Sequence, residues 1–191
     1  MRLRNAITDS VLPEPERWKE RFEEVRRRTR AICAPLLPEE FQLQSMPDVS
    51  PPKWHLGHTT WFFETFVLMP YLDDYRVYHP RFAYLFNSYY EGAGDFLPKP
   101  QRGLMARPSI EEVLEYRGHV DAAMERLIPR ITAPERAETL QRALSLLETG
   151  LNHEEQHQEL LLMDIKHNGW ASPLRSYYTP PPFVPTAFGL V

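Results

Sequence analysis

Cysteine is almost absent from the sequence, which has Cys33 alone among its 191 residues. A single thiol can form neither an intramolecular disulfide nor a thiolate metal cluster, and this usage fits a reducing compartment best. Long hydrophobic runs are also lacking, because no window approaches the roughly 18 apolar residues of a membrane span. The first residues lack the apolar core of a secretory signal. We therefore expect a cytoplasmic protein with no membrane partner.

An excess of positive charge is lacking as well, since the net charge is -4. The one basic run, "RRRTR" at residues 26–30, could in principle contact phosphates. However, Glu20, Glu23 and Glu24 lie at helical spacing beside it, which favours a solvated helix face. We expect no nucleic-acid partner.

Proline is abundant, with 19 residues that cluster between periodic stretches. The length and the 42% hydrophobic content are those of one globular domain, which we place at residues 1–170. Residues 171–191 are proline-rich and have no period, so they are predicted to be a linker or tail.

Hydrophobic residues recur at three- and four-residue steps in four stretches, as in amphipathic helices. The first spans residues 14–33, and the second spans residues 51–69, with Ser50 as its predicted cap. The third begins at Ser109, which forms a capping box with Glu112. The fourth runs from Pro134 to a stop at Asn168-Gly169. The residues predicted to be buried are Trp18, Phe22, Val25, Thr29, Ile110, Val113, Leu114, Val120, Ala123, Leu127, Leu140, Leu144, Leu147, Leu151, Leu161 and Ile165.

Residues 70–108 are rich in aromatic residues and follow no single period. We expect them to form a long ordered connection between helices two and three, with a short helix near residues 82–87. No stretch is a convincing strand, so the sequence predicts an all-α four-helix bundle.

The stretch "LNHEEQHQEL" at residues 151–160 places His153 and His157 four apart on the fourth helix. Side chains at this spacing project side by side and can chelate one metal ion. Gly150, one turn earlier, is interpreted as leaving room beside the metal for a third ligand or a substrate. For the third ligand we choose His58 over His55, because His58 lies nearer the face marked by Trp54, Trp61 and Leu68. Packed or surface roles are expected for His55, His79, His119 and His167.

The same pair matches the zinc-peptidase motif H-E-x-x-H, with Glu154 as its general base. This interpretation is disfavoured, because no glutamate follows Glu159 and because Leu160 and Met163 replace the residues of the metzincin extension. Asp164 could be an alternative ligand, but a role beside the ligands or at the surface is expected.

Several long blocks together resemble the amino-terminal, DinB-like domain of the EgtB-type sulfoxide synthases of ergothioneine biosynthesis. They are "SPPKWHLGHTTWFFETFVL", "YRVYHPRFAYLFNSYYEGAG", "PQRGL" with "RPSIEEVLEYRGHVD", and "LNHEEQHQELLLMDIKH". The resemblance spans residues 12–178 and implies a DinB-like four-helix bundle. It also implies non-haem Fe(II) held by His58, His153 and His157, with open positions for O₂ and substrates.

The resemblance further implies a hercynine oxygenase, which joins cysteine or γ-glutamylcysteine to hercynine in an O₂-dependent reaction. Gln156 matches a residue near the hercynine imidazole, and Lys99 and Arg102 match basic residues that hold the carboxylate of the thiol. The family's second domain, which is sulfatase-modifying-factor-like, is absent from this sequence. Three interpretations follow: the sequence is a fragment, a separate chain supplies that domain in trans, or the bundle alone has another function. The alternatives are a free-standing DinB-like, metal-dependent thiol S-transferase and a non-catalytic metal-binding module.

Overall fold

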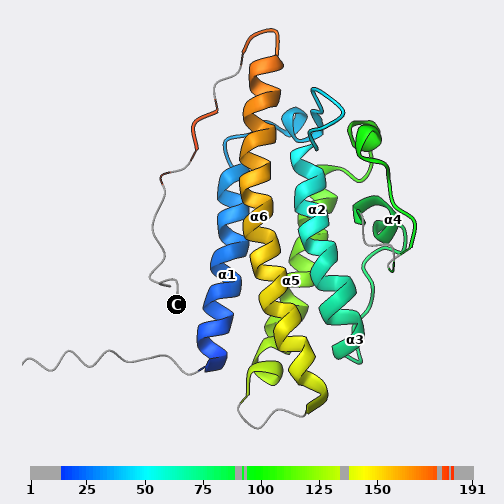
Figure 1. The fold of residues 1–191 in the computed structure, drawn as a ribbon, viewed down its shortest axis with the longest axis vertical. Coiled ribbons are helices and arrows are strands. Elements are labelled where there is room, and N and C mark those ends of the chain that lie inside the picture. The colour runs from blue at the N-terminus through cyan, green and yellow to red at the C-terminus, as the bar shows by residue number, and fades with distance from the viewer. Residues whose placement is uncertain are drawn as a thin grey trace, which may run out of the picture.

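The computed structural model describes residues 14–88, 92, 94–133, 138–175, 178–180 and 182. Within these ranges the protein is all-helical and has no strand, which confirms the predicted all-α bundle. Its four long helices among the described residues are α1 (Glu14–Cys33), α2 (Pro52–Phe63), α5 (Ile110–Thr132) and α6 (Gln141–Ala171) (Figure 1). The shorter elements are η1 (Pro38–Gln42), η2 (Glu64–Leu68), α3 (Met69–Tyr71), α4 (Phe82–Phe86), η4 (Lys99–Leu104) and η5 (Glu138–Leu140). None of the described helices combines the length and the apolar character needed to cross a membrane.

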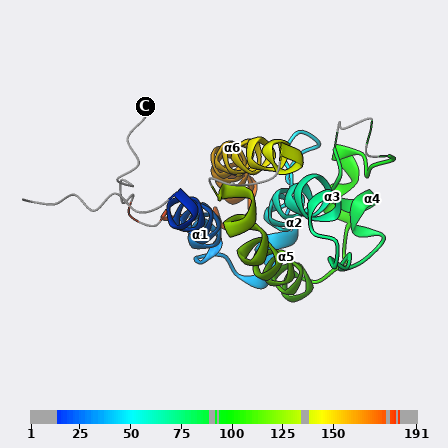
Figure 2. The same ribbon diagram turned by 90° about the horizontal axis from the view of Figure 1, so that it is seen from below.

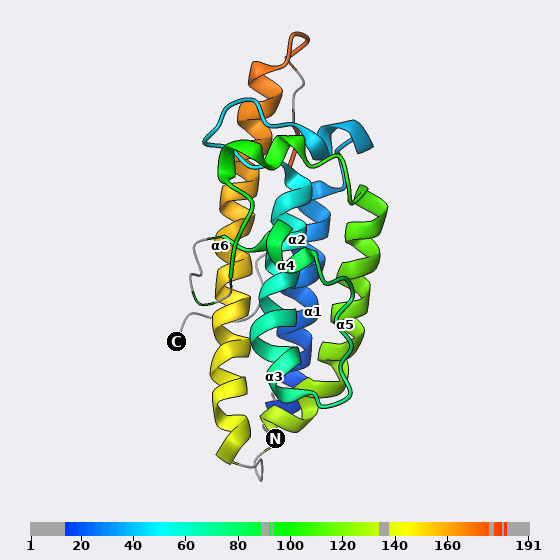
Figure 3. The ribbon, with the colours of Figure 1, turned by 90° about the vertical axis from the view of Figure 1, so that its right-hand side faces the viewer.

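Helix α2 is the most enclosed element of the bundle. Helices α1 and α2 lie at opposite corners, and each packs against both α5 and α6 (Figure 2). The connection that follows α3 covers the outer side of α2, where α4 packs against it (Figure 3). Every residue of α2 is consequently buried, as expected for a helix without a charged face.

The predicted helix starts are confirmed at α5 and wrong at α2. Ser109 accepts a hydrogen bond from the backbone N–H of Glu112, and the Glu112 carboxylate accepts one from the backbone of Ser109. Ser50 does not cap α2, whose N-cap residue is Pro51. The backbone N–H of Ser50 donates instead to Asp164, and its hydroxyl accepts from Arg102. Ser50 therefore links Asp164 of α6 to Arg102 of η4 and does not cap a helix.

Two predicted helix ends also differ. The second helix widens into the π-helical turn η2 and continues as α3 to Tyr71, with Pro70 in the first turn of α3. Helix α6 runs through Asn168 and Gly169 to Ala171, because the buried Asn168 side chain bonds to Leu43 and Ser45 and leaves the helix uninterrupted. The predicted start at Pro134 lies outside the described residues.

Most of the residues predicted to be buried lie in the core, but the predictions for Leu114 and for the basic run at residues 26–30 need correction. Leu114 is 42% exposed, because Val113 and the residues three and four positions after it occupy the inner face of α5. Arg26 is only 1% exposed, so the basic run is not a fully solvated face.

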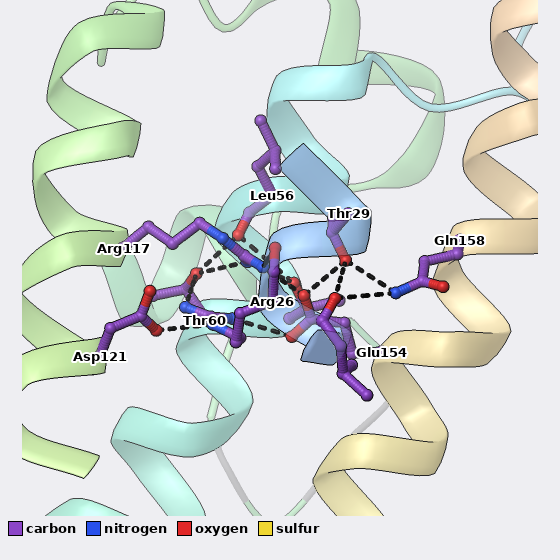
Figure 4. A network of polar contacts seen from close by, with 10 residues as sticks. Arg26, Thr29, Leu56, Thr60, Arg117, Asp121, Glu154 and Gln158 are labelled. Atoms are coloured by element: carbon purple, nitrogen blue, oxygen red, sulfur yellow. Dashed lines mark hydrogen bonds and ion pairs between the residues drawn. The ribbon is translucent and has the colours of Figure 1, made fainter. Parts of the chain in front are cut away.

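Arg26 belongs to a buried polar network that joins α1, α5 and α6 (Figure 4). Its guanidinium donates to Asp121 at 2.6 Å and to Glu154 at 2.8 Å. The Glu154 carboxylate also accepts from Arg117 and, at 2.6 Å, from the Thr29 hydroxyl. Because several partners share each charge, the network can lie in the core and fix the position of α6 against its neighbours.

Gly150 lets α6 approach α2 closely. A Cβ atom at this position would lie 2.6 Å from the Phe63 ring and 3.0 Å from the Phe62 ring. Its role is therefore close helix packing against two aromatic rings, and the interpretation of Gly150 as space for a metal ligand is corrected.

We expect Gly150→Ala to destabilise the fold by about 1–3 kcal/mol, because the fully buried Phe63 ring cannot move aside. Gly118 on α5 is the matched control, since a Cβ there meets nothing within 4 Å. Gly118→Ala should stabilise the protein by about 0.5–1 kcal/mol through helix propensity. Urea unfolding of both variants measures the two effects, and a Gly150→Ala variant as stable as Gly118→Ala would contradict the packing role.

Candidate metal centre

Helices α2 and α6 bring three histidines together. One nitrogen each of His58, His153 and His157 lie within 4.8 Å of one another. The Nε2 atoms of His58 and His153 are 3.2 Å apart, and His157 follows His153 by one turn of α6. The structure thus unites the three residues that the sequence singled out.

The ring of His58 is held in place on three sides. Its Nδ1 lies 2.6 Å from the Phe86 carbonyl oxygen, which can only accept, so Nδ1 carries the proton. The ring stacks on Trp54 and Trp61, with centroid distances of 4.4 Å and 5.7 Å. The lone pair of Nε2 therefore points towards His153.

His55 also lies beside the cluster, a position that the sequence did not indicate. It is 3% exposed, and its Nδ1 is 2.9 Å from Nδ1 of His157. On its other side, Nε2 lies 2.9 Å from a carboxylate oxygen of Asp164. Asp164 thus contacts His55, a neighbour of the cluster.

The imidazoles of the cluster are suited to binding a metal because they are neutral at pH 7. Burial lowers the pKa of His153 to about 4. Burial, together with the neighbouring histidines, lowers the pKa of His157 as well, and it lowers that of His58 well below its ordinary value. Three neutral imidazole nitrogens form a donor set that fits zinc, iron, nickel or copper.

Glu154 points away from this cluster, although it follows His153 directly. Its carboxylate is fully buried between Arg26, Arg117 and Thr29. A general base must reach the reacting atoms, and this carboxylate is held in the core on the other side of α6. The zinc-peptidase interpretation is therefore wrong in its choice of base.

The histidines line an open cavity of about 540 Å³. The three residues matched to substrate binding, Lys99, Arg102 and Gln156, line the same cavity. Arg102 is 3% exposed, stacks 3.3 Å above the centroid of Trp54 and donates to the Ser50 hydroxyl. Two cationic side chains therefore border the space in front of the cluster.

The fold and the site define a helical bundle with three histidines that can hold a metal ion at an open cavity. The family profile described as the DinB superfamily matches residues 21–161. The chain therefore belongs to the DinB superfamily. The search of curated proteins found no match.

Proposed function

We propose that this protein is the iron-binding domain of a hercynine oxygenase. The observation that carries the proposal is the meeting of three neutral imidazoles with two cationic side chains, Lys99 and Arg102, at one cavity. His58, His153 and His157 would hold Fe(II), which supplies an O₂-binding redox centre when it is bound. The substrates are inferred from the resemblance of the sequence to the EgtB-type synthases.

The proposed reaction balances without an external reductant. The thiol, cysteine or γ-glutamylcysteine, loses its S–H hydrogen, and hercynine loses one hydrogen from an imidazole carbon. A C–S bond forms, one oxygen atom of O₂ becomes the sulfoxide oxygen, and the other leaves as water. O₂ is thus the four-electron oxidant, with two electrons from bond formation and two from sulfur oxidation.

The residues around the cavity suit a thiol substrate that carries a carboxylate. Lys99 and Arg102 would bind its carboxylate, because both are cations and both line the cavity. Gln156, which is exposed on the cavity side of α6, would donate or accept a hydrogen bond at the hercynine imidazole. In the resembling family, a second domain completes the hercynine site.

The test is an anaerobic Fe(II) titration with nitric oxide as a spectroscopic substitute for O₂. We expect the chain alone to bind Fe(II), and we expect γ-glutamylcysteine to change the nitric oxide spectrum. Hercynine should change the spectrum once a sulfatase-modifying-factor-like domain is added in trans, and turnover should require that domain. Turnover by the chain alone would contradict the need for a second domain.

Two other outcomes would replace the proposal. A preference for zinc or nickel, with a response to the thiol but none to hercynine, would indicate a thiol S-transferase. A bound metal ion that responds to neither substrate would indicate a non-catalytic metal-binding module.

A further inference from the structure

A series of hydrogen bonds leads from Ser50, just before α2, to His157 of the cluster. The backbone N–H of Ser50 donates to Oδ2 of Asp164 at 2.8 Å. The same oxygen lies 2.9 Å from Nε2 of His55, whose Nδ1 lies 2.9 Å from Nδ1 of His157. This series of hydrogen bonds thus ends at Nδ1 of His157. Nε2 of His157 is therefore left for the three-histidine cluster.

The positions of the protons along this series of hydrogen bonds follow from Asp164, which is the acceptor. An ionised carboxylate can only accept, so Nε2 of His55 carries the proton that points to Asp164. A neutral imidazole has one N–H, so Nδ1 of His55 has a lone pair. That lone pair accepts the Nδ1 proton of His157, and Nε2 of His157 is left unprotonated.

We propose that His55 and Asp164 are positioning residues that hold His157 in the one tautomer whose Nε2 can bind a metal ion. Partners of this kind fix the tautomer and the ring orientation of ligating histidines and increase their basicity. The Phe86 carbonyl oxygen does the same for His58. The inference rests on the metal centre of the proposed function and is independent of the reaction and its substrates.

The competing explanation is that His55 merely fills space between α2 and α6. Two substitutions of similar polarity separate the alternatives. In His55→Asn the amide oxygen lies near the position of Nδ1. This oxygen can only accept, so it holds the Nδ1 proton of His157 without the help that the imidazole of His55 needs from Asp164. In His55→Gln the amide reaches the position of Nε2, so it keeps the contact with Asp164 and loses the one with His157.

Cobalt(II) alone is the probe, and its affinity is followed by its visible absorption. We expect His55→Asn to bind cobalt(II) nearly as tightly as the unchanged protein, and His55→Gln to bind it about 10- to 100-fold more weakly. A space-filling role predicts that the two variants bind alike, and equal affinities would overturn the proposal. Urea unfolding of both variants checks that each remains folded.

A measurement on the metal-free, unsubstituted protein keeps the test valid if a variant does not fold. Nitrogen-15 NMR of the histidine side chains reports which ring nitrogen carries the proton. We expect the Nδ1–H form for His157 and the Nε2–H form for His55, and the Nε2–H form for His157 would overturn the inference. If these tautomers are found but the unchanged protein binds no metal ion, the proposed function fails and the assigned tautomers stand.

Discussion

The His157→Ala variant is expected to bind no divalent metal ion, whereas the unchanged protein binds about one per chain. His157 and His153 lie one turn apart on α6, and His58 reaches them from α2. A metal centre with open positions usually needs three protein ligands, so two imidazoles alone hold the ion weakly. Elemental analysis after anaerobic reconstitution with Fe(II), and separately with zinc, measures the loss.

The matched control for this loss is His167→Ala, which removes an imidazole from the same helix. His167 contacts the Ser45 hydroxyl and is not one of the three clustered residues. Metal content should therefore stay at the level of the unchanged protein. Full occupancy in His157→Ala would end the three-histidine hypothesis, and loss of metal in His167→Ala would show that the ion binds elsewhere.

Local sequence patterns were sufficient to predict most helices. The bounds of α1 agree with the predicted residues 14–33, and the capping box at Ser109 starts α5 as expected. These features depend on residues at most four positions apart, so the sequence displays them directly. The burial of Arg26 could not be predicted in this way, because its partners Asp121 and Glu154 are 95 and 128 positions away.

The candidate site shows the same limit. The spacing of His153 and His157 is local, and the prediction that they lie together is confirmed. His58 was chosen by assigning α2 a single buried face. His55 was missed by the same argument, because α2 is buried on every side and has no solvent face to receive it. Gly150 was misinterpreted because the rings that require it belong to another helix.

The Glu154→Gln variant is expected to lose about 3–5 kcal/mol of unfolding free energy at pH 7. The substitution removes the negative charge that Arg26 and Arg117 share inside the core. Arg26 keeps Asp121, but Arg117 loses its ion pair with the carboxylate. Glu155→Gln is the matched control, because the adjacent Glu155 is exposed, and it should change stability by less than about 0.5 kcal/mol. Urea unfolding at pH 7 compares the two variants.

The pH dependence of this difference separates the charge of Glu154 from its packing. Burial alone would raise the pKa of Glu154, but the positive charges of Arg117 and Arg26 outweigh it and lower the pKa from 4.5 to about 2. A carboxyl whose pKa is lowered by folding stabilises the protein above its unfolded pKa, and the contribution is lost as the pH falls through the folded pKa. The difference in unfolding free energy between the unchanged protein and Glu154→Gln should therefore be constant from pH 7 to about 5. It should decrease by roughly 3 kcal/mol as the pH falls from 4.5 to about 2. A gap that is independent of pH would show that shape, and not charge, makes Glu154 necessary.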